Sequence, residues 1–242
     1  MRLRLKRLAY RRLIRPMALR IGLSRTGLIY ESIASKLGAK SITGIVDGGA
    51  YDGEVALYLA ELFPRAIVYA FEPTPPTFDV LVSTARNHPR IISVNAAIGS
   101  EMGKAKINHN RLASTNSLKP SLHDNSAEDM FMGRGDTLQS FDIDVITLDN
   151  FFEPKNQRID FIKLDVQGYE IEALKGAESV LSNAKAVMTE VRFFPLYEAD
   201  SLFQDIDFYL SERGFALQQI CEVTHRPSNR QAFEANAFWL KV

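Results

Sequence analysis

Apolar residues follow two alternating patterns along this chain. Short, mostly apolar runs predict buried strands, and between them apolar residues recur at helical spacing. The strand runs lie at residues 42–47, 67–72, 91–95, 159–165 and 186–191, and the helical patterns at 28–37, 53–63, 75–87, 170–175 and 202–213. Such alternation predicts an α/β fold with a parallel sheet covered by helices on both faces. Two last runs, at 215–223 and 235–242, are joined by a short polar segment and predict an antiparallel pair.

The first of these strands ends on an acid and turns through glycines into a helix. Gly48, Gly49 and Gly53 would let the backbone approach a ligand closely, although such a turn can also be purely structural. A dinucleotide site has the pattern G-x-G-x-x-G, and its middle glycine is replaced here by Ala50. The turn therefore favours a nucleotide-like ligand without specifying a dinucleotide.

Acidic residues around this turn narrow the choice of ligand. Asp47 ends the strand and Asp52 lies in the turn. At an effective dielectric constant of about 20, like unit charges about 4 Å apart repel by about 4 kcal/mol, so two carboxylates disfavour a pyrophosphate. They suit a ligand with positive groups, such as the ammonium and sulfonium of S-adenosylmethionine, whose carboxylate the helix N-terminus could hold. In the alternative interpretation, Asp47 is only a turn or capping residue.

Further acids end the later strands. Glu72 follows the second strand at close to the spacing of about 20 residues at which Rossmann-like sites place a ribose-binding carboxylate. Asp165 and Glu190 follow two more strands, and the carboxyl ends of parallel strands share one edge of a sheet. Together these two could bind a divalent cation such as Mg²⁺, which is an open alternative but not the expected one. The small residues around Ala97 could admit an adenine ring, or could simply pack.

A polar stretch at residues 110–135 interrupts the alternation. Polar stretches of about 25 residues are uncommon inside a compact domain and are usually lids, binding loops or disordered segments. A lid that completes the substrate pocket is the favoured interpretation. His109 and His123 are candidate proton acceptors in it, although loop histidines without a role are more common.

Composition and charge exclude several classes of function. The 242 residues carry 29 basic and 29 acidic side chains, so the formal net charge is zero and gives no case for a nucleic-acid partner. The single cysteine, Cys221, rules out an internal disulfide framework and argues weakly for a reducing, cytoplasmic location. Neither cysteines nor histidines show the spacing of zinc ligands.

The neutral total conceals a basic N-terminal arm. Residues 1–30 contain nine arginines and lysines and no acid, interleaved with apolar residues partly at helical spacing. Residues 1–25 could contact an anionic membrane or a protein partner, or could form a solvated helix that covers core surface. No apolar run there is long enough to span a bilayer. We expect a basic helical extension at 1–38 followed by one principal domain at 39–242.

The order and spacing of these motifs resemble the FkbM-like family of S-adenosylmethionine-dependent methyltransferases. The resemblance covers about residues 42–195, and its most specific part is the segment from Lys163 to Glu170. The remaining motifs are Val46–Ala50, Phe71–Pro73 and Thr189–Val191. The resemblance implies a Rossmann-like class I methyltransferase sheet of seven mostly parallel strands, with an antiparallel last strand. It also implies methyl transfer, usually to a hydroxyl of a sugar, other glycan or natural-product intermediate.

Residue roles follow from the resemblance. Asp47, Gly48 and Gly49 would bind the methionine end of the cofactor, Glu72 its ribose, and Ala97 and Ile98 the adenine. Asp165 would lie near the methyl group, and the candidates for the catalytic base are Asp165, Glu190 and His109. Two other functions stay open: a non-catalytic cofactor-binding subunit docked through the basic arm, and, less favoured, an NAD-type oxidoreductase.

Overall fold

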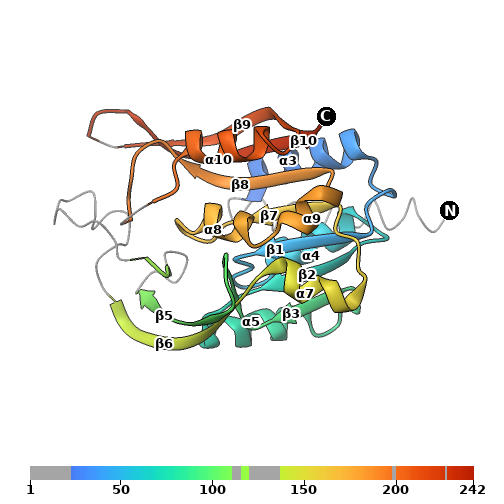
Figure 1. The fold of residues 1–242 in the computed structure, drawn as a ribbon, viewed down its shortest axis with the longest axis horizontal. Coiled ribbons are helices and arrows are strands. Elements are labelled where there is room, and N and C mark those ends of the chain that lie inside the picture. Colours follow the sequence, from blue (N-terminus) through green and yellow to red (C-terminus); the bar gives the residue numbers. More distant parts are fainter. Residues whose placement is uncertain (1–22, 111–115, 120–136, 198–199, 227) are drawn as a thin grey trace.

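The computed structural model describes residues 23–110, 116–119, 137–197, 200–226 and 228–242. Its centre is a seven-stranded sheet (Figure 1). In spatial order the strands are β3 (Ile91–Val94), β2 (Ile67–Phe71), β1 (Gly44–Gly48), β7 (Phe161–Leu164), β8 (Ala186–Arg192), β10 (Ala232–Lys241) and β9 (Phe215–His225). The first five strands are parallel, and β10 runs antiparallel to both of its neighbours. This order confirms the predicted Rossmann-like class I methyltransferase fold.

Alternating side chains of the central strands fill two separate cores. Val46 and Ile162 pack on one face, while their chain neighbours Ile45 and Phe161 pack on the other. The first face is covered by α7 (Leu148–Phe152), α8 (Glu170–Lys175), α9 (Glu178–Asn183) and α10 (Phe203–Ser211). The second face is covered by α3 (Leu23–Leu37), α4 (Glu54–Leu62) and α5 (Pro75–Ala85). Because successive strand side chains point to opposite faces, an unbroken apolar run feeds both cores.

A smaller sheet lies beside the main one and below it in Figure 1. It contains β4 (Ala97–Ile98), β6 (Thr137–Ile146) and β5 (Gly103–Asn110), with β6 in the middle. Ala97, Ile107, Ile143 and Val145 form its own small core. After β6, α7 and a short 3-10 helix, η3 (Glu153–Lys155), lead back to the main sheet. Most of the stretch predicted as a lid lies outside the described residues.

Helix α3 belongs to the packed domain. The sequence pattern predicted a helix at 28–37, and α3 begins earlier, at Leu23. Ile29, Tyr30 and Ile33 are buried in the same core as the apolar residues of α4 and α5. Residues 1–22 are outside the described chain, so the basic part of the extension predicted at 1–38, and its membrane or partner contact, remain predictions. Among the helices that are described, none is both long and apolar enough to cross a membrane.

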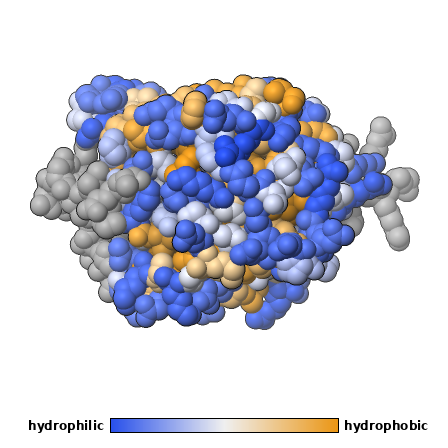
Figure 2. All heavy atoms as spheres, viewed as in Figure 1, coloured by the Kyte–Doolittle hydropathy of each residue, from blue (hydrophilic) through white to orange (hydrophobic). Residues whose placement is uncertain are grey.

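Hydrophilic residues occupy most of the face shown in Figure 2, with hydrophobic residues scattered between them. The large apolar side chains are instead concentrated inside, where Trp239, Phe63, Phe71 and Phe161 are all fully buried. Burial of such side chains supplies about 1.5–3 kcal/mol each and is the main term that holds the layers together.

The strand register brings the predicted acids to one edge. Gly48, the last residue of β1, pairs with Phe71 on one side and Leu164 on the other. Leu164 in turn pairs with Thr189. The residue that directly follows each of these three partners is an acid, namely Glu72, Asp165 and Glu190. Parallel alignment thus converts three distant sequence positions into neighbours.

Candidate functional site

A cavity of about 220 Å³ opens at the carboxyl ends of β1, β2 and β7. The glycine turn and the β2 exit form one side, the smaller sheet another, and the segment after β7 a third. Of the residues predicted for the cofactor, Gly49, Glu72, Ala97, Ile98 and Asp165 line this cavity. The other predicted site residues, Asp47, Gly48, Glu190 and His109, lie around it without forming its wall.

The glycine turn fits closely against the β7 exit. Gly49 has a φ of 74°, in the left-handed region, and a Cβ at this position would overlap the carbonyl oxygen of Asp165. Only glycine satisfies both requirements without strain. The Gly49 and Ala50 N–H groups donate to the Phe71 carbonyl at 3.0 and 2.9 Å. These two amides are therefore used in hydrogen bonds inside the protein.

Glu72 is held in place by backbone donors at the cavity wall. The Thr74 N–H donates to Oε1 at 2.9 Å and the Tyr51 N–H donates to Oε2 at 3.2 Å. Burial raises the pKa of Glu72, and the hydrogen bonds from Thr74 and Tyr51 oppose that rise. Each carboxylate oxygen has two acceptor positions, so a fixed Glu72 retains capacity for two hydroxyl donors. A ribose diol has that donor pattern.

Asp47 lies behind the cavity, where it pairs with Lys163. The two side chains are almost fully buried, and Lys163 Nζ lies 3.0 Å from Asp47 Oδ1. Lys163 Nζ also donates to the Gly49 carbonyl at 3.3 Å. Burial raises the pKa of Asp47, and Lys163 opposes that rise. Burial alone would lower the pKa of Lys163, but Asp47 and Asp165 outweigh it and the pKa is raised.

Lys163 was not among the residues predicted for the site, yet it lines the cavity. Its signal was present in the sequence, because Lys163 and Asp165 are two positions apart at a strand end and therefore share a face. Asp47 supports the glycine turn indirectly, because it pairs with Lys163 and Lys163 donates to the Gly49 carbonyl. Its direct contact with a cofactor stays a prediction.

The remaining wall is largely apolar. Ala97 and Ile98 in β4 are buried and line the cavity together with Phe71 and Ile107. β4 is held in the smaller sheet by parallel pairing with β6. An apolar wall next to a polar rim is a suitable environment for an aromatic base.

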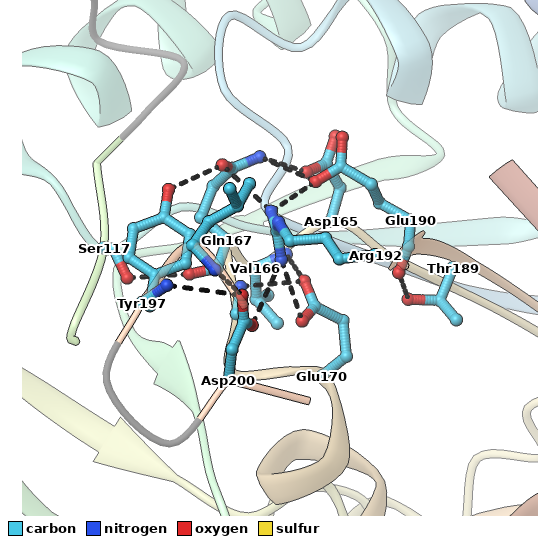
Figure 3. A network of polar contacts seen from close by, with 12 residues as sticks. Ser117, Asp165, Val166, Gln167, Glu170, Thr189, Glu190, Arg192, Tyr197 and Asp200 are labelled. Atoms are coloured by element: carbon cyan, nitrogen blue, oxygen red, sulfur yellow. Dashed lines mark hydrogen bonds and ion pairs between the residues drawn. The ribbon is translucent and has the colours of Figure 1, made fainter. Parts of the chain in front are cut away.

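A polar network connects the exits of β7 and β8 (Figure 3). Gln167 Nε2 donates to Asp165 Oδ1 at 2.8 Å and to Glu190 Oε2 at 3.2 Å. Arg192, which is fully buried, donates from Nη2 to the same Glu190 oxygen at 2.6 Å. Burial and the nearby Asp165 raise the pKa of Glu190, and Arg192 opposes this. Asp165 lines the cavity, whereas Glu190 lies beside it in Figure 3 and is not part of the wall.

The arrangement of Asp165 and Glu190 does not resemble a two-carboxylate metal site. The amide nitrogen of Gln167 donates to both carboxylates and so occupies the position between them. A cation there would have to displace an N–H donor, and Mg²⁺ prefers oxygen ligands. Among the residues that the structure describes, no group of three or more His, Cys, Asp or Glu side chains is arranged to hold a metal.

His109 contacts the cavity only through a neighbour. Its Nδ1 lies 3.2 Å from the Asn116 amide nitrogen, and Asn116 lines the cavity. Its ring packs edge-on against Phe141, with 6.0 Å between ring centroids. His123 lies outside the described residues. Of the three candidate bases, Asp165 is therefore the one at the cavity wall.

Comparison with known proteins identifies the family. The model of the methyltransferase FkbM domain matches residues 47–217, which is more than half of the chain and includes every strand-end acid described above. The chain belongs to this family. FkbM-domain membership confirms the resemblance seen in the sequence motifs and identifies the protein as a methyltransferase. The NAD-type oxidoreductase alternative is not retained.

Several curated relatives are described as methyltransferases. Methyltransferase sdnD of Sordaria araneosa is 26% identical over 71% of this chain and 73% of its own length. Hexuronic acid methyltransferase AglP of Haloferax volcanii is 28% identical over 52% of this chain and 48% of its own length. Methyltransferase 1 of Beauveria bassiana is 28% identical over 55% of this chain and 58% of its own length. The matches thus span about half of the last two proteins and nearly three quarters of the first.

A solved structure of a SAM-dependent methyltransferase from Aquifex aeolicus is 12% identical to the chain. The superposition covers 88% of this chain and 89% of the other, with a TM-score of 0.43. So distant a likeness carries no argument about activity. The fold assignment for the FkbM-domain protein rests on its own strand order.

Proposed function

We propose that this FkbM-domain protein transfers the methyl group of S-adenosylmethionine to a hydroxyl oxygen of a sugar or natural-product intermediate. The observation that carries the proposal is the fixed carboxylate of Glu72 inside a cavity with an apolar wall, at the end of β2. The relative AglP, described as a hexuronic acid methyltransferase, supports a sugar as acceptor.

The charge of the cavity favours a cationic donor. Its described wall carries the carboxylates of Asp52, Glu72 and Asp165 and one ammonium, that of Lys163. Asp47 pairs with that ammonium from outside the wall. The surplus of negative charge would attract the sulfonium and ammonium groups of S-adenosylmethionine and repel a pyrophosphate.

In the proposed complex, Glu72 would accept hydrogen bonds from the ribose hydroxyls, and Ala97 with Ile98 would contact the adenine. The methionine end would lie along the turn that begins at Gly49. When bound, S-adenosylmethionine supplies a methyl group activated by the positive sulfur. The protein then has to align the acceptor, exclude water and remove a proton.

We assign the proton-accepting role to Asp165. It lines the cavity, whereas Glu190 and His109 do not. As the acceptor oxygen forms its bond to the methyl carbon, the hydroxyl proton would pass to Asp165, and the electron pair of the broken carbon–sulfur bond would stay on sulfur. The smaller sheet and the segment at 116–119 would shield this step from water.

Calorimetry on the wild-type protein and a Glu72→Gln variant tests the cofactor site. Loss of the charged acceptor should weaken binding of S-adenosylmethionine about 10- to 100-fold, since hydrogen bonds to charged groups contribute about 1.5–3 kcal/mol. Glu61→Gln is the matched control, because Glu61 is exposed and pairs with His88 away from the cavity. Equal affinity in all three proteins would refute the role of Glu72.

The reaction itself is tested with isotope-labelled methyl donor and a panel of hydroxylated acceptors that includes neutral sugars and uronic acids. Transfer to a hydroxyl is the expected result. Binding of S-adenosylmethionine without transfer to any acceptor would favour the alternative of a non-catalytic cofactor-binding subunit.

A further inference from the structure

Gln167 occupies an unusual position in the turn after β7. Its φ is 52°, which places a residue with a side chain in the left-handed region, and Gly168 beside it has a φ of 92°. The hydroxyl of Ser117 donates to the Gln167 carbonyl at 2.7 Å. The Glu170 carboxylate accepts from the N–H groups of Val166 and Gly168 at 3.1 and 3.2 Å. A strained residue fixed from both sides suggests that its side chain has a defined task.

The carboxamide of Gln167 uses all its hydrogen-bonding positions. Its two N–H bonds go to Asp165 and Glu190, as described above, and its Oε1 accepts from Arg192 Nη2 at 3.3 Å and from the Tyr197 hydroxyl at 3.1 Å (Figure 3). Carboxylates only accept and arginine only donates. Only one of the two amide orientations therefore satisfies the four neighbours.

The residues behind Gln167 are anchored in the core. Arg192 is fully buried and lies 5.1 Å from the centre of the Tyr197 ring. Its Nη1 lies 3.7 Å from Glu170 and 3.6 Å from Asp200, in addition to the close contact with Glu190. Because a buried, multiply paired arginine has little freedom, the orientation that it imposes on the carboxamide is rigid.

The front of the network is Asp165. Its N–H donates to the Gly48 carbonyl at 2.9 Å, so β1 fixes its backbone. Asp165 lines the cavity, and its Oδ1 accepts a hydrogen bond from Gln167 Nε2. A carboxylate at a cavity wall can rotate about χ1 and χ2 unless something holds it.

We propose that Gln167 is a positioning residue, which transmits the fixed orientation of Arg192 and Tyr197 to Asp165 and keeps that carboxylate directed at the acceptor. This inference deepens the proposed O-methyl transfer and rests on it. Glu190 is also part of this network, since its Oε2 accepts hydrogen bonds from both Arg192 and Gln167 and so links the buried arginine to the carboxamide.

The test compares Gln167→Met, which keeps the size of the side chain but removes the carboxamide, with the wild-type protein. Misplacement of a reacting group by about 1 Å can cost about 100-fold in rate. We expect kcat to fall by about that factor while the Kd for S-adenosylmethionine, measured by calorimetry, changes less than about threefold. Gln218→Met on the exposed edge strand β9 is the matched control and should leave both values unchanged.

Tyr197→Phe is the milder second variant. It removes one of the two donors to Gln167 Oε1 and leaves Arg192 in place, so a smaller fall in kcat is expected, again without loss of cofactor affinity. A purely structural role would lower the midpoint of thermal unfolding and leave kcat per folded molecule intact. Wild-type kcat in folded Gln167→Met would overturn the proposal.

Crystal structures provide a readout that does not depend on turnover. With S-adenosylhomocysteine bound to both proteins, the Asp165 carboxylate should leave its wild-type rotamer in Gln167→Met while Glu72 stays in place. An unmoved Asp165 would refute the positioning role even if the wild-type protein methylated nothing. Absence of transfer in the wild-type protein would instead refute the proposed function, and the two failures remain distinguishable.

Discussion

Among single residues, Asp47 and Lys163 form a buried ion pair in which only the lysine lines the cavity. Both follow from the sequence as charged residues on apolar strands, and the register of β1 against β7 makes them direct partners. A charge buried alone is strongly unfavourable, but a buried pair is tolerated when its geometry is good. The lysine thereby becomes available to the cavity while the aspartate holds it.

Removing one partner should show this dependence. Lys163→Met leaves Asp47 buried without its counter-charge and should lower the free energy of unfolding by about 3–5 kcal/mol. Urea denaturation followed by circular dichroism measures the change. Adding Asp47→Asn to Lys163→Met should restore part of the loss, because an amide needs no counter-charge.

Lys104→Met is the control for this prediction. Lys104 and Asp144 form an even closer pair, with 2.6 Å between Nζ and Oδ1, but both side chains are mostly exposed. Solvent screens such pairs, so the control should be nearly as stable as the wild-type protein. Equal effects of Lys104→Met and Lys163→Met would contradict the importance of burial.

At the scale of elements, the turn between β1 and α4 depends on one close approach. Gly49 lies directly against the main chain that follows β7, with no room for a Cβ. This contact joins two strands that are neighbours in space and more than a hundred residues apart along the chain. The turn and the β7 exit therefore form one unit.

Gly49→Ala should disrupt that unit. The left-handed backbone alone costs about 1–3 kcal/mol for a residue with a side chain, and the overlap with the Asp165 carbonyl adds to it. We expect a lower midpoint of urea unfolding together with weaker binding of S-adenosylmethionine, because the displaced carbonyl belongs to a cavity residue. Both are measured on the same preparation.

Gly103→Ala provides the matched control. Gly103 begins β5, and a Cβ there would meet nothing within 4 Å. Stability and cofactor binding should both stay close to those of the wild-type protein. If Gly49→Ala had the same stability and cofactor affinity as Gly103→Ala, the close approach at Gly49 would contribute to neither property.

The pattern of apolar residues predicted the strands, but it did not predict which charged residues would be buried between them. Strands β1, β2, β7 and β8 were predicted with the acids at their ends, since apolar runs ending in Asp or Glu are visible in the sequence. The role of Arg192 was not predicted, because a lone arginine at a strand end gives no sign of burial. Its three acidic neighbours, Glu170, Glu190 and Asp200, come from separate segments.

In the whole molecule, the two ends of the parallel strands carry different structures. The carboxyl edge carries the cavity, while the opposite edge carries a structural ion cluster around Asp160. The Asp160 carboxylate accepts from the Thr43 N–H at 2.7 Å and from its hydroxyl at 2.9 Å. Lys185 Nζ lies 3.1 Å and Arg158 Nε 3.0 Å from its other oxygen. The cluster ties together the starts of β1, β7 and β8.

This cluster predicts a pH dependence of stability. Burial alone would raise the pKa of Asp160, but the hydrogen bonds from Thr43 and Lys185 outweigh it and the pKa is lowered. Because the folded pKa lies below the unfolded value of about 3.9, the stabilisation is present above that value and is lost as the pH falls through the folded pKa. Asp160→Asn should cost about 1–3 kcal/mol at pH 7.

Urea unfolding of the wild-type and Asp160→Asn proteins at pH 7 and at pH 3 checks the sign. The difference between them should shrink at the lower pH. A difference that grew toward acid would mean that protonated Asp160 is the stabilising form, contrary to the geometry.

The amino-acid sequence alone was sufficient to predict the α/β class, the family and the edge of the sheet that carries the cavity. These follow from local patterns: apolar runs, helical spacing, glycines in a turn and acids at strand ends. The folded structure was needed to show that Lys163 lines the cavity, that Asp47 pairs with it from outside the wall, and that Gln167 donates hydrogen bonds to both Asp165 and Glu190. Burial and pairing depend on which distant segments meet, and the register of the sheet sets that.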